Sequence, residues 1–149
     1  MGLWTQDEGL VSAIVRGAAG APVAFCDHDP LDLLVIGPDL PQSSGGVGCP
    51  IVLLPGTAGP LARRLHSGCT VSYGPSPKDT LTFSSLEGRQ ICLAIQRELI
   101  TLAGAVVDQQ EVILSLPTGC SPQSFLATAG ALLIIGIPPE ELARRLDLV

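Results

Sequence analysis

The C-terminal third of the chain, residues 111–146, constrains the fold more than any other stretch. It opens with the apolar segment Val112–Leu116, which predicts a buried strand, and then turns through prolines and a glycine over residues 117–122. A run of small and aliphatic side chains follows and predicts a helix from Pro122 to about Ile135, with a short last helix after it. A buried strand, a glycine-bearing turn and a closely packed helix are typical of the ligand crevices of α/β domains.

The composition indicates a sheet that is covered on both faces. Of the 149 residues, 46% are hydrophobic, only 15% are charged and 3% are aromatic, whereas soluble domains usually carry about 25% charged residues. The core must therefore consist of aliphatic side chains, which suits a largely parallel sheet between layers of helices. We predict one α/β domain over residues 1–149, with three layers and a mixed, mostly parallel sheet that includes an antiparallel hairpin. The apolar excess could also leave a surface for a homo-oligomer or a protein partner.

Charge, hydropathy and cysteine usage exclude several classes of protein. The formal net charge is −6 and Lys78 is the only lysine, so there is no basic stripe for nucleic acid. The longest apolar run, residues 127–137, contains glycines and is too short to cross a bilayer, and no signal-peptide pattern opens the chain. The five cysteines include no Cys-x-x-Cys pair, which favours free thiols and a cytoplasmic location. We therefore expect neither nucleic acid nor a membrane as a partner.

Hydrophobic periodicity predicts the elements of the first half. A helix over residues 6–19 would place Leu10 and Ile14 on one face. A second helix is expected over Gly59–Ser67, with His66 near its end as a partner of the helix dipole. Five strands are expected in this half, Pro22–Cys26, Leu31–Ile36, Pro50–Leu54, Thr70–Tyr73 and Asp79–Ser84. In the last of them threonines and a serine alternate with Leu81 and Phe83, which predicts a half-exposed strand.

Residues 89–102 fit two different structures. The aliphatic residues Ile91, Ile95 and Leu99 share one face of a helix, but Ile91, Leu93 and Ile95 also alternate as in a strand. In the second case Gly104 would turn the chain back into a strand over Val106–Leu116. Periodicity alone leaves both open.

Taken in order, the pattern resembles the central domain of the Mur ligases, ATP-dependent amide-bond-forming enzymes of peptidoglycan synthesis, and of their folylpolyglutamate synthetase relatives. In that family a strand leads to a Leu-Pro-Gly turn, an alanine-rich helix ending in Leu-Gly-Ile and a short Pro-Glu-Glu helix. A strand that ends in Tyr/Phe-Gly before antiparallel strands is also a family feature, and it favours the hairpin for residues 89–116. The matching stretches here are Thr70–Gly74, Leu116–Gly119, Ala127–Ala131, Ile135–Pro138 and Glu140–Leu142.

The chain departs from the resembled family where that family does its chemistry. A phosphate loop needs glycine N–H groups, a lysine and a hydroxyl for Mg²⁺. The candidate remnant of such a loop, Gly2–Gly9, has two glycines, no lysine and two carboxylates. The asparagines that contact nucleotide in the family are replaced within Ser121–Phe125, and its Asn-Asp-Asp is replaced by Leu54–Gly56. These departures argue against ATP-driven ligation, so we predict a degenerate phosphate loop, no catalytic residues, no metal and no cofactor.

Cys26, Asp27, His28 and Asp29 form the densest group of functional side chains and follow an expected strand. Cys26 and His28 could be metal ligands, or a nucleophile and its base. They could equally belong to a solvated turn that ends the strand, which we favour because no further ligand spacing accompanies them.

Gly119, Cys120 and Ser121 precede the expected long helix. Exposed N–H groups there could hold an anion, or Ser121 could cap the helix with its side-chain oxygen. We favour the cap, while keeping these residues and Cys26–Asp29 as the candidate ligand-binding residues.

Three functions follow in order of preference. The first is a non-catalytic Mur-ligase-like binding or assembly module. The second is a protein that binds a small molecule or an anion, such as a nucleotide or a cell-wall precursor, near Cys26–Asp29 and Gly119–Ser121. The third is a Cys/His-dependent enzyme.

Overall fold

The computed structural model describes residues 2–5, 7–21, 23–25, 31–39, 48–58 and 66–146. The helices are α1 (Glu8–Gly17), α3 (Pro122–Ile135) and α4 (Leu142–Leu146), with the 3-10 turns η1 (Gly56–Ala58) and η2 (Pro139–Glu141). The strands are β1 (Gly2–Thr5), β2 (Ala24–Phe25), β3 (Leu33–Val35), β4 (Gly48–Pro55), β5 (His66–Tyr73), β6 (Leu81–Glu87), β7 (Gln90–Ile95), β8 (Leu99–Ile100), β9 (Val106–Val107) and β10 (Gln110–Ser115).

Within the described residues, eight strands form one sheet in the order β10-β7-β6-β5-β4-β3-β1-β2. From β2 to β6 the neighbouring strands run parallel, whereas β6, β7 and β10 are antiparallel. This confirms the predicted mixed, mostly parallel sheet. It also decides the structure of residues 89–102, where β7 is a strand and β8 pairs with β9 in a small second sheet. Ile91, Leu93 and Ile95 are all buried, as the strand alternation predicted.

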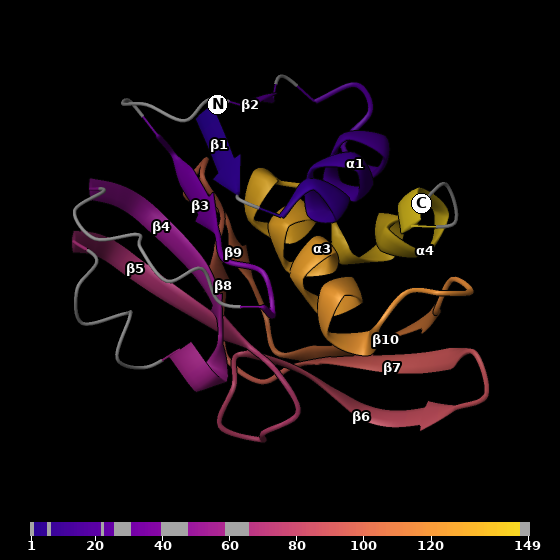
Figure 1. Ribbon diagram of the computed structural model, residues 1–149. Coiled ribbons are helices and arrows are strands. Elements are labelled where there is room, and N and C mark those ends of the chain that lie inside the picture. The colour runs from indigo at the N-terminus through magenta and orange to yellow at the C-terminus, as the bar shows by residue number, and fades with distance from the viewer. Residues whose placement is uncertain are drawn as a thin grey trace.

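The sheet is buried on both of its faces at its centre. Successive residues of β3 and β4 point to opposite faces, and Leu33, Leu34, Val52 and Leu53 are all fully buried. Figure 1 shows α1, α3 and α4 together over one face, and these helices contact one another. The burial on both faces is what the predicted three-layer α/β class requires. Among the described helices none combines the length and the apolar character that a membrane span needs.

Helix α3 lies close to the sheet because its central side chains are small. Every residue from Phe125 to Ile135 is buried, so the helix is covered all round, as its uniformly apolar sequence indicates. A Cβ atom at Gly130 would lie 2.7 Å from Leu81 Cδ1 and 3.1 Å from Leu53 Cδ2. The predicted close approach of the alanine- and glycine-rich helix is therefore confirmed. Gly136, with a φ of 122°, ends α3 as predicted.

The predicted helix over Gly59–Ser67 is wrong at its C-terminal end. His66 and Ser67 belong to β5, where they pair with Gly48 and Cys49 of β4, so no helix ends at His66. Pairing with β4 satisfies the backbone of these residues, a tertiary effect that overrides local helical periodicity. The rest of the predicted helix, residues 59–65, lies outside the described residues.

The predicted half-exposure of residues 79–84 is also wrong. Thr80 and Thr82 are buried although they are polar, and only 4% of Thr82 is exposed. Thr82 pairs with Ala94 of β7, and β6 is exposed from Ser84 onward, where its register with β7 shifts. Alternating polarity failed here because the first half of the strand is covered on both faces.

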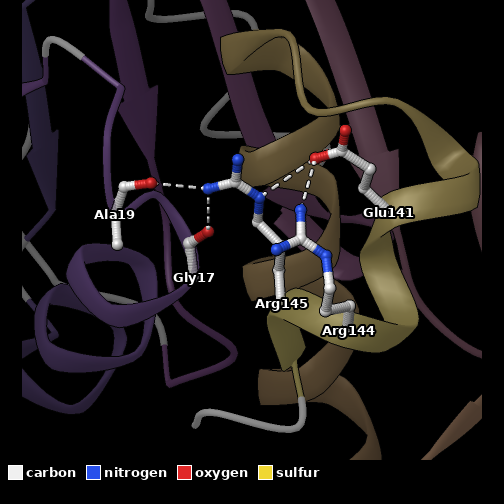
Figure 2. A network of polar contacts seen from close by, with 5 residues as sticks. All are labelled: Gly17, Ala19, Glu141, Arg144 and Arg145. Atoms are coloured by element: carbon white, nitrogen blue, oxygen red, sulfur yellow. Dashed lines mark hydrogen bonds and ion pairs between the residues drawn. The ribbon is translucent and has the colours of Figure 1, made fainter.

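A cationic side chain ties the C-terminal helix to the end of α1 (Figure 2). Arg145 Nη1 donates to the carbonyl oxygens of Gly17 at 3.2 Å and of Ala19 at 2.7 Å. Its Nε donates to Glu141 Oε2 at 3.3 Å, an oxygen that Arg144 also contacts. Arg145 therefore provides hydrogen-bond donors for carbonyl groups that have no intrahelical partner at the end of α1.

We predict that Gly130→Val lowers the free energy of unfolding by about 1–3 kcal/mol, the usual cost of overpacking a core. The added methyl groups would meet Leu81 and Leu53. Chemical denaturation measures the loss, and Ala143→Val in the exposed part of α4 is the control, with an expected change of at most about 0.7 kcal/mol. Equal losses in both variants would contradict the close packing of α3.

We predict that Arg145→Met lowers the free energy of unfolding by about 1–2 kcal/mol, because it removes charge-assisted hydrogen bonds to two carbonyls while keeping the apolar stem. Arg144→Met is the matched control, since the Arg144 side chain is 71% exposed and its ion pair contributes about 0–1 kcal/mol. Urea unfolding of both variants tests the difference. An equal effect of the two substitutions would show that Arg145 does not hold α4 against α1.

Candidate functional site

The two groups of predicted ligand-binding residues have different outcomes. Cys26, Asp27, His28 and Asp29 lie outside the described residues. Gly119, Cys120 and Ser121 lie in the turn that leads from β10 into α3, and all three line a cavity. Their role as ligand contacts stays a prediction.

The cavity has a volume of about 320 Å³ and lies between the start of α1 and the start of α3. From the α1 side it is lined by Asp7, Gly9, Leu10 and Ala13. From the other side it is lined by residues 117–121 of the turn and by Ser124 and Thr128 of α3. Two segments more than a hundred residues apart in sequence therefore make one concave surface, of a size that suits a small molecule.

Ser121 caps α3, as the favoured interpretation of the turn predicted. Its Oγ accepts a hydrogen bond from the backbone N–H of Ser124 at 3.1 Å and donates to Ser124 Oγ at 2.9 Å. Gly119 has a φ of 81°, a conformation that favours glycine and that turns the chain toward the helix. Because the cap occupies the N–H of Ser124, this donor is not free to hold an anion.

Cys120 is held as a thiol. Its Sγ donates to the carbonyl oxygen of Ser121 at 3.5 Å, and burial raises the pKa of the thiol above its ordinary value. The thiolate is the nucleophile and the metal-binding form of cysteine. At neutral pH the environment of Cys120 therefore opposes both roles.

Asp7 is the principal site residue whose role the sequence pattern did not reveal. Its Oδ1 accepts from the N–H of Leu10 at 3.2 Å and caps α1, while its Oδ2 lies against Gly37, where a Cβ would be 2.8 Å away. An aspartate three residues before a buried helical leucine is a recognisable cap signal. Its carboxylate occupies the N-terminus of α1, where a phosphate loop would offer its N–H groups to an anion.

The bounds of the loop predicted over Gly2–Gly9 are therefore corrected, and its origin as a degenerate phosphate loop stays a prediction. Gly2–Thr5 form strand β1 rather than a loop, and α1 begins at Glu8. Only residues 6 and 7 separate the two elements, which is too short for a glycine-rich loop around a phosphate.

Tyr73 lies across the carboxyl ends of the parallel strands β5, β4 and β3. Its hydroxyl donates to the carbonyl oxygen of Ile36 at 2.7 Å, so the side chain reaches from the end of β5 across β4 to the end of β3. Tyr73 is fully buried. Burial, followed by the charges of Asp7 and Asp39, raises its pKa. A buried tyrosine and two carboxylates thus stand at the edge of the sheet where α/β proteins commonly bind ligands.

The charge of the cavity is set by one residue. Among the described residues that line it, Asp7 is the single charged side chain, and none of them is a lysine or an arginine. The remaining polar groups are neutral hydroxyls and backbone amides. This lining suits a neutral or cationic molecule, and it repels phosphates.

No protein-family model matches the chain, and no curated protein matches it. Two solved structures from Acinetobacter baumannii are similar to it, one of UDP-N-acetylmuramoylalanyl-D-glutamyl-2,6-diaminopimelate--D-alanyl-D-alanyl ligase and one of MurF. Each has a TM-score of 0.51 and 10% sequence identity, over 98% of this chain. The chain spans 45% and 44% of the two ligase chains, respectively. The resemblance to Mur ligases predicted from the sequence is confirmed as a likeness of fold.

We predict that stability falls as pH rises above about 10, the ordinary pKa of tyrosine. A pKa raised in the folded state means that folding favours the neutral phenol, so this stabilisation is complete below the unfolded pKa and is lost above it. Tyr73 is the only tyrosine, so its ionisation can be followed directly by ultraviolet absorbance. Tyrosinate should form only as the protein unfolds.

The control for this prediction is Tyr73→Phe, whose free energy of unfolding should fall less steeply over the same alkaline range. Titration of the folded wild type near the ordinary tyrosine pKa would contradict the buried hydrogen bond to Ile36.

Proposed function

We propose that this protein is a non-catalytic binding domain with a Mur-ligase-like fold, which holds a small neutral or cationic polar molecule between α1 and α3. The observation that carries the proposal is the cavity of about 320 Å³, in which Asp7 is the only charged side chain among the described lining residues. A concave surface with an apolar wall and a few convergent polar groups is the usual form of a small-molecule site. Leu10 and Ala13 supply apolar wall, and Thr118 and Ser124 supply hydroxyls.

The absence of ligase chemistry belongs to the same proposal. Phosphoryl transfer relies on lysine, Mg²⁺ and backbone N–H groups to stabilise phosphate charge. In this chain the Asp7 carboxylate caps α1, and the Tyr73 hydroxyl binds the carbonyl oxygen of Ile36 at the end of β3. Both features support a fold that keeps its scaffold without the nucleotide site. We further propose a cytoplasmic location, which fits the free thiols of Cys69, Cys92 and Cys120.

A thermal-shift and calorimetric screen tests the binding proposal. The probes are MgATP, which is anionic, amino sugars in a neutral form, and free diamines, which are cationic. We expect a raised melting temperature with a neutral or amine-bearing probe and no shift with MgATP. Asp7→Asn keeps the helix cap, because asparagine caps as well as aspartate. It should weaken the binding of the cationic probes only.

Ala13→Leu should abolish the shift because it fills the cavity. Ser12→Leu adds the same side chain to an exposed position of α1 outside the lining and should leave binding intact. A melting shift with MgATP that Ala13→Leu removes would contradict the assigned charge preference. Silence with all three classes of probe would count against the cavity as a binding site.

A further inference from the structure

We propose that β10 is a dimerisation strand that pairs antiparallel with β10 of a second copy of this chain, which would join two sheets into one. β10 ends the described sheet order, and among the described residues only β7 pairs with it. An edge strand presents unpaired N–H and C=O groups that can accept another strand. The proposal concerns a surface away from the α1–α3 cavity and goes beyond the proposed ligand binding.

The register of β10 identifies which backbone groups are free. Leu116 N donates to Arg89 O, and every residue of β10 lies opposite β7 in the same register, from Ser115–Gln90 to Gln110–Ile95. Hydrogen-bonded pairs alternate in an antiparallel ladder, so the even-numbered residues of β10 bond to β7. The backbones of Glu111, Ile113 and Ser115 therefore point to the open edge, and all three residues are exposed.

Ile113 makes this edge attractive to another strand. It is 63% exposed, more than any other large hydrophobic side chain of the described residues. It continues a cross-strand row that runs from Ser85 through Cys92. Natural edge strands commonly carry lysine or proline against unwanted pairing, whereas β10 has neither and carries only Glu111 as a charge.

The identities of the three edge residues select a second copy and one register. With Ile113 on a two-fold axis, Ile113 faces its own equivalent and Glu111 faces Ser115 of the second copy. No like charges then oppose each other, and a β-branched pair forms at the centre. A shift of the axis to Glu111 would set two carboxylates opposite each other. A shift toward the end of the strand would bring in Pro117, which has no N–H to donate.

Sedimentation of the whole chain over a wide concentration range tests the proposal. We expect a reversible monomer–dimer equilibrium whose dissociation constant Ile113→Lys raises by at least about tenfold, because like charges would meet on the axis. Ile100→Lys is the matched control, since Ile100 is 51% exposed and lies on β8, outside the edge. A wild-type chain that stays monomeric, or a dimer that only Ile100→Lys weakens, would overturn the proposal.

Charge-changing variants of Ser115 and Glu111 distinguish an effect on the proposed register from a general effect on folding. Ser115→Glu should weaken the dimer because a carboxylate would then face Glu111 of the second copy. The double variant Glu111→Lys with Ser115→Glu should restore it, because opposite charges would face each other on both sides of the axis. Failure of the double variant to recover the dimer, with melting temperatures equal to the wild type, would contradict this register.

Amide hydrogen exchange gives a readout that depends on the backbone alone. On raising the protein concentration, the amides of Glu111, Ile113 and Ser115 should gain protection, while those of Val112 and Leu114 are already protected by β7. Concentration-dependent protection elsewhere, with none at these three amides, would place the contact outside β10.

Discussion

The approach of α3 to the sheet is the contact on which the rest of the structure depends. At Gly130 the backbone of the helix lies so close to Leu53 and Leu81 that no side chain fits between them. The same helix receives α1, where a Cβ at Gly17 would lie 2.7 Å from Leu132 Cδ1. Arg145 then binds the end of α1 to α4. Gly130 and Gly17 therefore set the distances from α3 to the sheet and to α1. Arg145 holds α4 against the end of α1.

The position of α3 also decides where a ligand could be held. Helices α1 and α3 contact each other. The cavity lies between their first turns, with Asp7 on one side and the 117–121 turn on the other. At the ends of β3 and β5 the buried Tyr73 side chain binds the carbonyl oxygen of Ile36. The concave surface is thus beside the two helices and separate from the Tyr73 hydroxyl. Its negative charge distinguishes it from a phosphate site.

Sequence patterns predicted part of the candidate site and missed the rest for a physical reason. The turn Gly119–Ser121 and its serine cap depend on residues within four positions of one another, so local chemistry was sufficient. The partnership of Asp7 with Gly37, and of Tyr73 with Ile36, depends on strand order, which local patterns do not contain. From the sequence the carboxylates of Gly2–Gly9 are only charges unfavourable to phosphate, whereas the structure shows that Asp7 caps α1.

The resemblance to the Mur ligase fold favoured the strand over residues 90–95, which periodicity alone left open. By itself the sequence determined the α/β class and the long buried helix with its glycine stop. Each depends on hydrophobic periodicity or on a glycine or proline at a boundary, which act over a few residues. Only the tertiary structure decided that His66 begins a strand, that Thr82 is buried and that β10 ends the sheet formed by the described residues. These outcomes depend on which strands become neighbours, and the free energy of that pairing and burial exceeds the weak local preference of a few residues.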